Sequence, residues 1–235
     1  MILAATAGGV TPLLASAGKD AIDPAAFAAF FAKRQTVRKY KSDPVPEEHI
    51  KQILDAARRA PCCMNQQAWK FLVVRDPAKI AAMKKATLDL IGKRYEEYIA
   101  KQPAEKAAEL ALQKARSVTF ASNYFTAPCY VAVLVDRQAP CSGYALGHDG
   151  PIAAGYLMLA ARAFGYGTAY LTDGIPEEVA RKVLAIPDRY HRVCVTPIGI
   201  PDGWPKAAYK RKLEENVVWE DFSNDKPLEK IPYNP

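Results

Sequence analysis

The chain has 235 residues, of which 50% are hydrophobic and 24% are charged, and it carries a formal net charge of +7. These values are typical of a soluble globular protein and fit one compact α/β-type unit with short arms. The basic residues alternate with acidic ones and form no dense basic stripe with interleaved aromatic residues, which argues against nucleic-acid binding. The five cysteines have no regular spacing, so a disulfide scaffold and a metal site are both disfavoured.

The first 17 residues are mostly small and apolar and end in Ala-Ser-Ala, which resembles the apolar region and cleavage site of a secretory signal. No Lys or Arg precedes this region. Two interpretations remain open: residues 1–22 form a loosely ordered arm of a cytoplasmic protein, or they are the remnant of an export signal of a periplasmic one. The apolar run is too short and too interrupted by Gly and Pro to span a bilayer.

A helix is expected to begin at Asp23, which is a favourable N-cap and is followed by Pro24 at the first helical position. Phe27, Phe30 and Phe31 recur on one side of this helix. We expect them to form its buried face. The helix leads directly to a cluster of polar residues.

That cluster contains Arg34, Thr36 and Arg38, which alternate along the sequence. If the segment is extended, the three side chains point to one side and present two cations and a hydroxyl group. Such a set suits an anionic ligand of about the size of a phosphate.

A short amphipathic helix is predicted after the cluster. Pro46 fits its first turn, Glu47 and Glu48 complement its positive end, and a helix rarely continues through Pro61. The turn that follows, residues 61–67, offers side-chain amides that can hydrogen-bond the carbonyls and ring nitrogens of a heterocycle. These amides belong to Asn65, Gln66 and Gln67.

The order and spacing of these residues resemble the FMN-dependent nitroreductase family. The family pattern is R-x-[ST]-x-R-x-[YF], then a helix, then A-P-x-x-x-N-x-Q-x-W-x-F. This chain supplies it with Arg34, Thr36, Arg38, Tyr40, Ala60, Pro61, Asn65, Gln67, Trp69 and Phe71. The resemblance implies an α+β fold with a small, mostly antiparallel central sheet covered by helices. It also implies an intertwined homodimer with FMN at both interfaces.

The resemblance assigns roles to individual positions. The first cluster, Arg34, Gln35, Thr36 and Arg38, is expected to grip the phosphate and the pyrimidine edge of FMN. The turn is expected to reach the flavin from the second subunit and to contact it through Pro61, Cys62, Cys63, Asn65 and Gln67. This chain departs from the family at Cys62 and Cys63, where small or hydroxyl residues are usual, and at Ala68, where proline is usual.

The rest of the chain alternates strands and helices. Strands are predicted over residues 70–75, 128–135 and 192–199, and a short helix over 176–184. Residues 79–122 suggest two or three helices interrupted near Gln102 and Pro103. Residues 149–164 form a helix that is apolar on nearly all sides and needs cover on all sides; a partner subunit or a monomer core could each provide it.

Two more groups are assigned to FMN by the resemblance alone. Leu171, Thr172 and Asp173 follow a glycine-bounded strand whose end is expected to present backbone N–H groups to the flavin. Lys210 or Arg211 corresponds to a basic residue that reaches the phosphate, but one residue is missing from the spacing, so the choice between them stays open. We expect one FMN-binding domain over residues 23–225, and a tail over 226–235 that extends across the partner.

The implied function is an FMN-dependent oxidoreductase. It would pass hydride from NADH or NADPH to a nitroaromatic, a quinone or a similar small-molecule acceptor by a ping-pong mechanism. No catalytic side chain is assigned, because the three histidines are scattered and the flavin carries the chemistry. The alternatives are a specialised relative, such as a reductive dehalogenase or an ene reductase, and a flavin- or thiol-based redox sensor that uses Cys62 and Cys63. A packing role for these two cysteines is favoured over a redox role. Cys129 and Cys194 lie in apolar runs and are expected to be buried.

Overall fold

The structure is a computed structural model that describes residues 22–223 and 227–231. The predictions for residues 1–17 and for most of the 226–235 tail therefore lie outside the described residues. The chain divides into two compact units, one ending at Arg34 and the other beginning at Gln35.

The first unit contains helix α1 (Pro24–Ala32). Its start is as predicted: the Asp23 carboxylate accepts hydrogen bonds from the amides of Ala25 and Ala26 at 3.2 and 3.1 Å. The predicted buried face is wrong for the described chain, because Phe27 and Phe31 are 49% and 44% exposed. Within this unit the two rings pack on each other with centroids 4.7 Å apart, and the unit offers no second helix or strand among its described residues to cover them.

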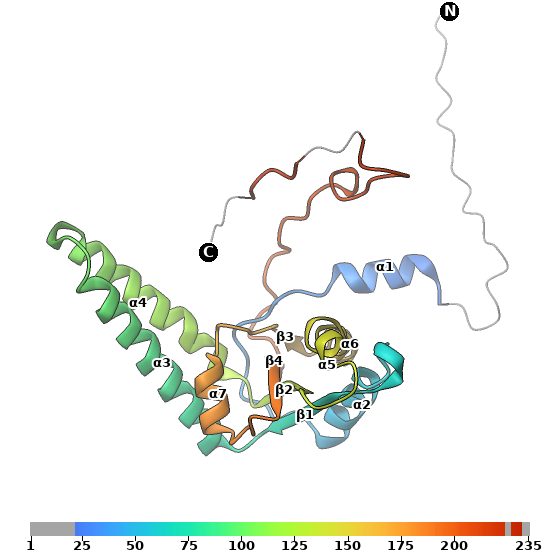
Figure 1. Cartoon of the computed structure of the whole chain (residues 1–235), viewed down its shortest axis with the longest axis horizontal. Coiled ribbons are helices and arrows are strands. Elements are labelled where there is room, and N and C mark those ends of the chain that lie inside the picture. Colours follow the sequence, from blue (N-terminus) through green and yellow to red (C-terminus); the bar gives the residue numbers. More distant parts are fainter. Residues whose placement is uncertain (1–21, 224–226, 232–235) are drawn as a thin grey trace, which may run out of the picture. The chain divides into compact units, whose positions relative to one another are not determined.

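The second unit is built on a four-stranded sheet (Figure 1). Its strands are β1 (Trp69–Val74), β2 (Cys129–Asp136), β3 (Gly167–Thr168) and β4 (Tyr190–Gly199), and they lie in the order β1-β2-β4-β3. Every neighbouring pair is antiparallel. The small antiparallel sheet of the predicted α+β fold is thereby confirmed.

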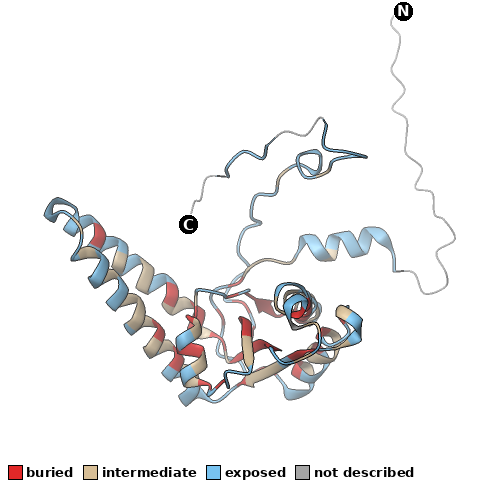
Figure 2. Ribbon diagram, viewed as in Figure 1, coloured by how far each residue is buried: buried red, intermediate tan, exposed pale blue. Residues whose placement is uncertain are grey.

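Strand β2 is buried along its whole length (Figure 2). Successive side chains of a strand point to opposite faces of the sheet. On β2, Tyr130 and Ala132 join one hydrophobic cluster, while Val131 and Val133 join another. The sheet therefore has a hydrophobic core on each face.

Helices cover both faces. The first core includes residues of α3 (Pro77–Ile99), α4 (Ala107–Asn123) and α7 (Glu177–Val183). The second core includes residues of α2 (Glu47–Ala57) and α6 (Gly150–Ala163). The shorter helical pieces are η1 (Cys63–Asn65), η2 (Ala104–Lys106), η3 (Tyr124–Thr126), α5 (Ser142–Tyr144), the π-helical η4 (Ala145–Asp149) and η5 (Leu213–Glu215).

The observed boundaries are close to the predicted ones, and the differences have local causes. Pro46 is the N-cap of α2 and not its first helical residue. Helix α2 ends at Ala57, and Arg58 and Arg59 form a turn. The interruption at Gln102 and Pro103 lies between α3 and α4, as predicted.

The segment that follows Gln35 docks on the sheet edge. The amide of Val37 donates to the carbonyl of Thr168 at 2.9 Å, and the amide of Lys41 donates to that of Ile200 at 2.9 Å. The Tyr40 hydroxyl donates to the carbonyl of Val37 at 2.6 Å. Gly167 allows the close approach, because a Cβ there would lie 2.5 Å from Cγ2 of Val37.

We expect Gly167→Ala to destabilise the protein by about 1–3 kcal/mol, the usual effect of overpacking a close contact. The matched control is Gly92→Ala, whose Cβ would meet only Lys114 Cε at 3.8 Å. Since Gly92 lies inside α3, alanine there should stabilise by about 0.5–1 kcal/mol. Urea unfolding of both variants measures the difference. A Gly167→Ala variant as stable as the wild type would contradict this account of the docking.

Candidate functional site

The extended segment that begins at Gln35 carries three of the predicted phosphate residues, Gln35, Thr36 and Arg38. Thr36 pairs with Thr168 beside strand β3, and Val37 is buried between Thr36 and the exposed Arg38. The Arg38 guanidinium lies over the ring of Phe120, 5.5 Å from its centroid. Stacking of this kind orients a guanidinium while leaving its N–H groups free to donate. Arg34 belongs to the first unit and the other three residues to the second.

The C-terminal basic pair lies close in space to this segment. The side-chain oxygen of Gln35 accepts a hydrogen bond from the amide of Ala208 at 3.4 Å. Arg211 is engaged locally: its guanidinium forms an ion pair with Glu215 at 3.4 Å and hydrogen-bonds the carbonyl of Glu229. Lys210 is exposed, and no ion-pair partner lies near it within the described residues. Of the pair, Lys210 is therefore the available cation.

The turn over residues 61–67 has a strained backbone. Met64, Asn65 and Gln67 have φ angles of 48°, 55° and 47°, which side-chain-bearing residues adopt infrequently. The Gln67 side chain donates to the side-chain oxygen of Asn65 at 3.2 Å. Such strain persists only where surrounding contacts fix it, and it gathers at functional sites.

Asp149 provides one of the contacts that fix the turn. Its carboxylate oxygens lie 3.2 and 3.1 Å from the amide nitrogen of Cys63, which donates to them. Asp149 is buried and is the N-cap residue of α6. The turn is thus attached to the start of the apolar helix, and a hydrogen bond to a charged group of this kind contributes about 1.5–3 kcal/mol.

Three thiols and a thioether meet at the same turn. Cys62 Sγ accepts from the amide of Gln67 at 3.3 Å, and Cys141 Sγ donates to Met64 Sδ at 3.4 Å. A hydrogen bond with Cys141 raises the pKa of the Cys63 thiol, and burial raises it further. The other cysteines are buried as predicted, and burial raises the pKa of Cys129 to about 12 and of Cys194 to about 11.

The loop after β3 is held by contacts with strand β4. Leu171 is buried and exchanges backbone hydrogen bonds with Val195 at 3.2 and 2.9 Å, whereas Thr172 and Asp173 are exposed. Arg192 is 7% exposed, and its guanidinium donates to the carbonyls of Thr172 at 2.7 Å and Leu171 at 3.5 Å. Burial lowers the pKa of Arg192, and its Nε has no hydrogen-bond partner within the described residues.

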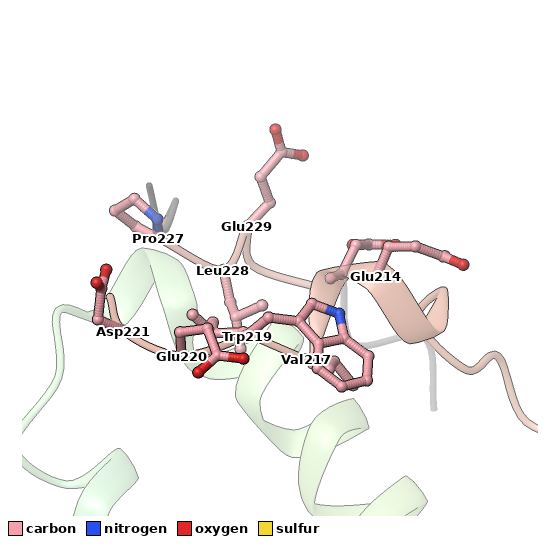
Figure 3. A pocket seen from close by; sticks show the side chains of 10 residues that line it. Glu214, Val217, Trp219, Glu220, Asp221, Pro227, Leu228 and Glu229 are labelled. Atoms are coloured by element: carbon pink, nitrogen blue, oxygen red, sulfur yellow. The ribbon is translucent and has the colours of Figure 1, made fainter. Parts of the chain in front are cut away.

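A hollow lies elsewhere, along the C-terminal segment. It measures about 700 Å³ and is lined by ten residues between Glu214 and Glu229, with the indole of Trp219 among them (Figure 3). Five of these ten residues carry carboxylates, namely Glu214, Glu215, Glu220, Asp221 and Glu229. A negatively charged lining disfavours a phosphate, so this hollow is not the candidate cofactor site.

The structure therefore brings together three of the predicted groups. Residues 35–38 contact Thr168 near the start of the 171–173 loop, and Gln35 contacts the segment that leads to Lys210. The 61–67 turn is attached separately, at the start of α6. Among residues 22–223 and 227–231, no three His, Cys, Asp or Glu side chains gather closely enough to hold a metal ion. In the same residues, no helix is both long and apolar enough to cross a membrane.

The sequence did not point to Asp149, Arg192 or Cys141 as residues of the candidate site. Arg192 left a signal, because it is a basic residue at the start of an otherwise apolar strand. Asp149 was visible only as a helix start. Cys141 left none, because its contacts with Cys63 and Met64 join distant parts of the sequence.

The fold and a match to a known protein family define the class of this protein. The fold is an α+β sheet-and-helix unit, and residues 31–200 match the Nitroreductase family. The chain belongs to the nitroreductase family, an oxidoreductase superfamily.

Individual relatives differ in what their names describe. An NADH dehydrogenase of Thermus thermophilus is 30% identical over 210 residues, which cover 80% of this chain and 92% of the relative. An iodotyrosine deiodinase of Thermotoga neapolitana is 29% identical over 180 residues, covering 76% and 90%. The solved structure of an FMN-dependent nitroreductase of Clostridium difficile has a TM-score of 0.60 and 25% identity, covering 83% of this chain and 99% of that one.

Proposed function

We propose that this protein is an FMN-dependent oxidoreductase that passes hydride from NADH or NADPH to nitroaromatic, quinone or similar electrophilic acceptors in a ping-pong mechanism. Membership of the nitroreductase family over residues 31–200 carries the proposal. Bound FMN would supply the redox chemistry, and the protein would supply its binding, orientation and electrostatics. Donor and acceptor would use the same open face in turn.

The donor set of the second unit fits a flavin phosphate and pyrimidine edge. Arg38 and Lys210 are exposed cations, and Gln35 and Thr36 add an amide and a hydroxyl in the segment that leads to Arg38. Arginine and lysine both bind phosphate through charge-assisted hydrogen bonds. By the family resemblance, Arg34 would complete this set.

The 171–173 loop offers backbone donors. A peptide group's N–H points opposite to its C=O, so the hydrogen bond from Arg192 to the Thr172 carbonyl turns the Asp173 amide away from Arg192. That amide donates to no acceptor within the described residues. It is therefore available to a ring nitrogen of the flavin. Since Arg192 is a buried cation next to this loop, it would also favour a negatively charged reduced flavin.

A homodimer is part of the proposal. Helix α6 is apolar on nearly all sides, and its Ile152 and Tyr156 are exposed. The C-terminal segment exposes Trp219 and Phe222. Large exposed apolar side chains in such numbers mark surfaces that associate with a partner. A second subunit would bring its own 61–67 turn to the flavin, as the family resemblance implies.

A second candidate within the same chemistry is reductive dehalogenation. It is favoured by the 29% identity to a deiodinase over 76% of this chain. Anaerobic turnover of halogenated phenols against nitroaromatics and quinones, with equal enzyme and donor, separates the two. Release of halide faster than reduction of every nitro or quinone substrate would favour the dehalogenase.

The test of the main proposal is the absorption spectrum of the purified protein, followed by anaerobic titration with NADH and NADPH. We expect the bands of oxidised FMN, bleaching with at least one nucleotide, and recovery on adding a nitroaromatic or quinone. A colourless protein that takes up no added FMN would overturn the proposal.

The two C-terminal cations form a matched pair of variants. We expect Lys210→Met to weaken FMN binding about tenfold, because one ion pair with phosphate contributes about 1–2 kcal/mol. Arg211→Met should change the dissociation constant less than threefold, since Arg211 already contacts Glu215 and Glu229. Fluorescence titration of apoprotein with FMN measures both. The reverse order would assign the phosphate to Arg211.

Arg192 provides a further prediction. Arg192→Met leaves the carbonyl of Thr172 without this donor and removes a buried cation, whereas the carbonyl of Leu171 keeps its hydrogen bond from the Val195 amide. We expect FMN binding to weaken about tenfold, consistent with loss of a hydrogen bond from a charged group, and the flavin reduction potential to fall. Arg192→Lys keeps the charge and should restore most of the potential. An unchanged potential in the Met variant would show that Arg192 acts only on stability.

A further inference from the structure

A group of sulfur atoms stands at the 61–67 turn. It comprises the thiols of Cys62, Cys63 and Cys141 and the thioether of Met64. Cys141 Sγ contacts Met64 Sδ at 3.4 Å, and the thiol of Cys63, the residue next to Met64, interacts with Cys141 as well. These contacts join the turn to the segment that precedes α5 and η4, which is far away in the sequence.

We propose that Cys63 and Cys141 form a reversible disulfide that locks the 61–67 turn onto the segment before α6. The cysteines adjacent in sequence are not the reactive pair. Cys62 is turned toward the amide of Gln67, from which its sulfur accepts a hydrogen bond at 3.3 Å. A disulfide between neighbouring residues also strains the required Cα–Cα and dihedral geometry.

Access and backbone anchoring favour this pair. Cys63 and Cys141 are partly exposed, so a small oxidant reaches them, whereas Cys129 and Cys194 are buried. The amide of Cys63 is held by Asp149, and Asp149 follows Cys141 by less than three helical turns through α5 and η4. The turn is thus held against this segment from two directions before any bond forms. Cys141 itself has a φ of 60°, and Met64, the residue after Cys63, has a φ of 48°.

The oxidant is a hydroperoxide. One thiolate attacks the peroxide, the O–O bond breaks, and a sulfenic acid and an alcohol form, or water when the oxidant is hydrogen peroxide. The second thiol displaces water from the sulfenic acid and closes the S–S bond. In sum, two thiols lose two electrons and two protons, and the peroxide takes up both. A dithiol reductant reverses the reaction through a mixed disulfide.

The consequence for the cofactor rests on the proposed function. A disulfide S–S distance is about 2.05 Å, which is shorter than any contact between two thiols. Closing it draws Cys63 toward Cys141 and shifts Asn65 and Gln67, which already have strained backbones. We therefore expect oxidation to weaken FMN binding or turnover severalfold, with full recovery on reduction.

Peptide mapping tests the bond itself and needs no flavin. The purified full-length protein is treated with hydrogen peroxide, alkylated under denaturing conditions without reductant, and digested with trypsin. We expect a cross-link between the peptides Ala60–Lys70 and Gln138–Arg162, lost on adding dithiothreitol. A bond within Ala60–Lys70, a link between two chains, or sulfinic acid without a cross-link would overturn the proposal.

Two variants assign the sulfur atoms, because Cys62 and Cys63 lie on the same peptide. Cys62→Ser should retain the cross-link, and Cys63→Ser should lose it. If Cys62→Ser loses the cross-link and Cys63→Ser retains it, the assignment is wrong.

Flavin titration of the oxidised and reduced forms then separates this inference from the proposed function. A mapped cross-link in a protein that binds no FMN would leave the disulfide standing and overturn the oxidoreductase. Conversely, a flavoprotein that shows no cross-link would overturn the disulfide alone. Cys141→Ser is the control for the titration, and its FMN affinity should not respond to peroxide.

Discussion

Burial of strand β2 on both faces is the constraint on which the rest of the second unit depends. Its side chains feed one hydrophobic core through Tyr130 and Ala132 and another through Val131 and Val133. A sheet that is apolar on both faces requires helices on both. The α3, α4 and α7 layer and the α2 and α6 layer satisfy that requirement. The residues that we propose for the cofactor accordingly lie at the sheet edge by β3 and in the connecting turns and loops.

Those edge residues are held by backbone contacts. The amide of Val37 donates to the carbonyl of Thr168, and Leu171 exchanges backbone hydrogen bonds with Val195. The amide of Cys63 donates to the carboxylate of Asp149. Loops anchored in this way can keep exposed polar groups at fixed positions, which a redox cofactor requires for orientation. The anchors themselves are buried or apolar, so the chemistry of the site and the stability of the fold share the same residues. Arg192 is the clearest case, because it is buried under a loop whose next residues are exposed.

Sequence alone predicted most of the fold, whereas its assignment of the FMN site stays a prediction. The continuous apolar run around Tyr130 identified β2, and the near-absence of polar residues after Asp149 identified α6, because burial on all sides leaves a direct mark on composition. The exposed Phe27 and Phe31 were predicted wrongly. Periodicity shows that a helix has an apolar face but not whether its own chain covers that face.

Long-range pairs were beyond prediction for a different reason. Nothing local distinguishes Cys141 from an isolated thiol, and only the folded chain brings it to Cys63. The proposal that Lys210 and not Arg211 meets the phosphate likewise rests on contacts that the structure supplies, those of Arg211 with Glu215 and Glu229. The assignments of all the FMN-binding residues and of the residue 23–225 domain remain predictions.

The three residues with positive φ in the 61–67 turn matter for the engineering of this protein. Met64 has a φ of 48°, and the same conformation is nearly free of steric cost for glycine. A search for thermostable variants would therefore select glycine in place of Met64. Relaxing this position would loosen a segment that its surroundings hold in an unfavourable backbone conformation, so gains in heat resistance and losses in activity should arise at the same residue.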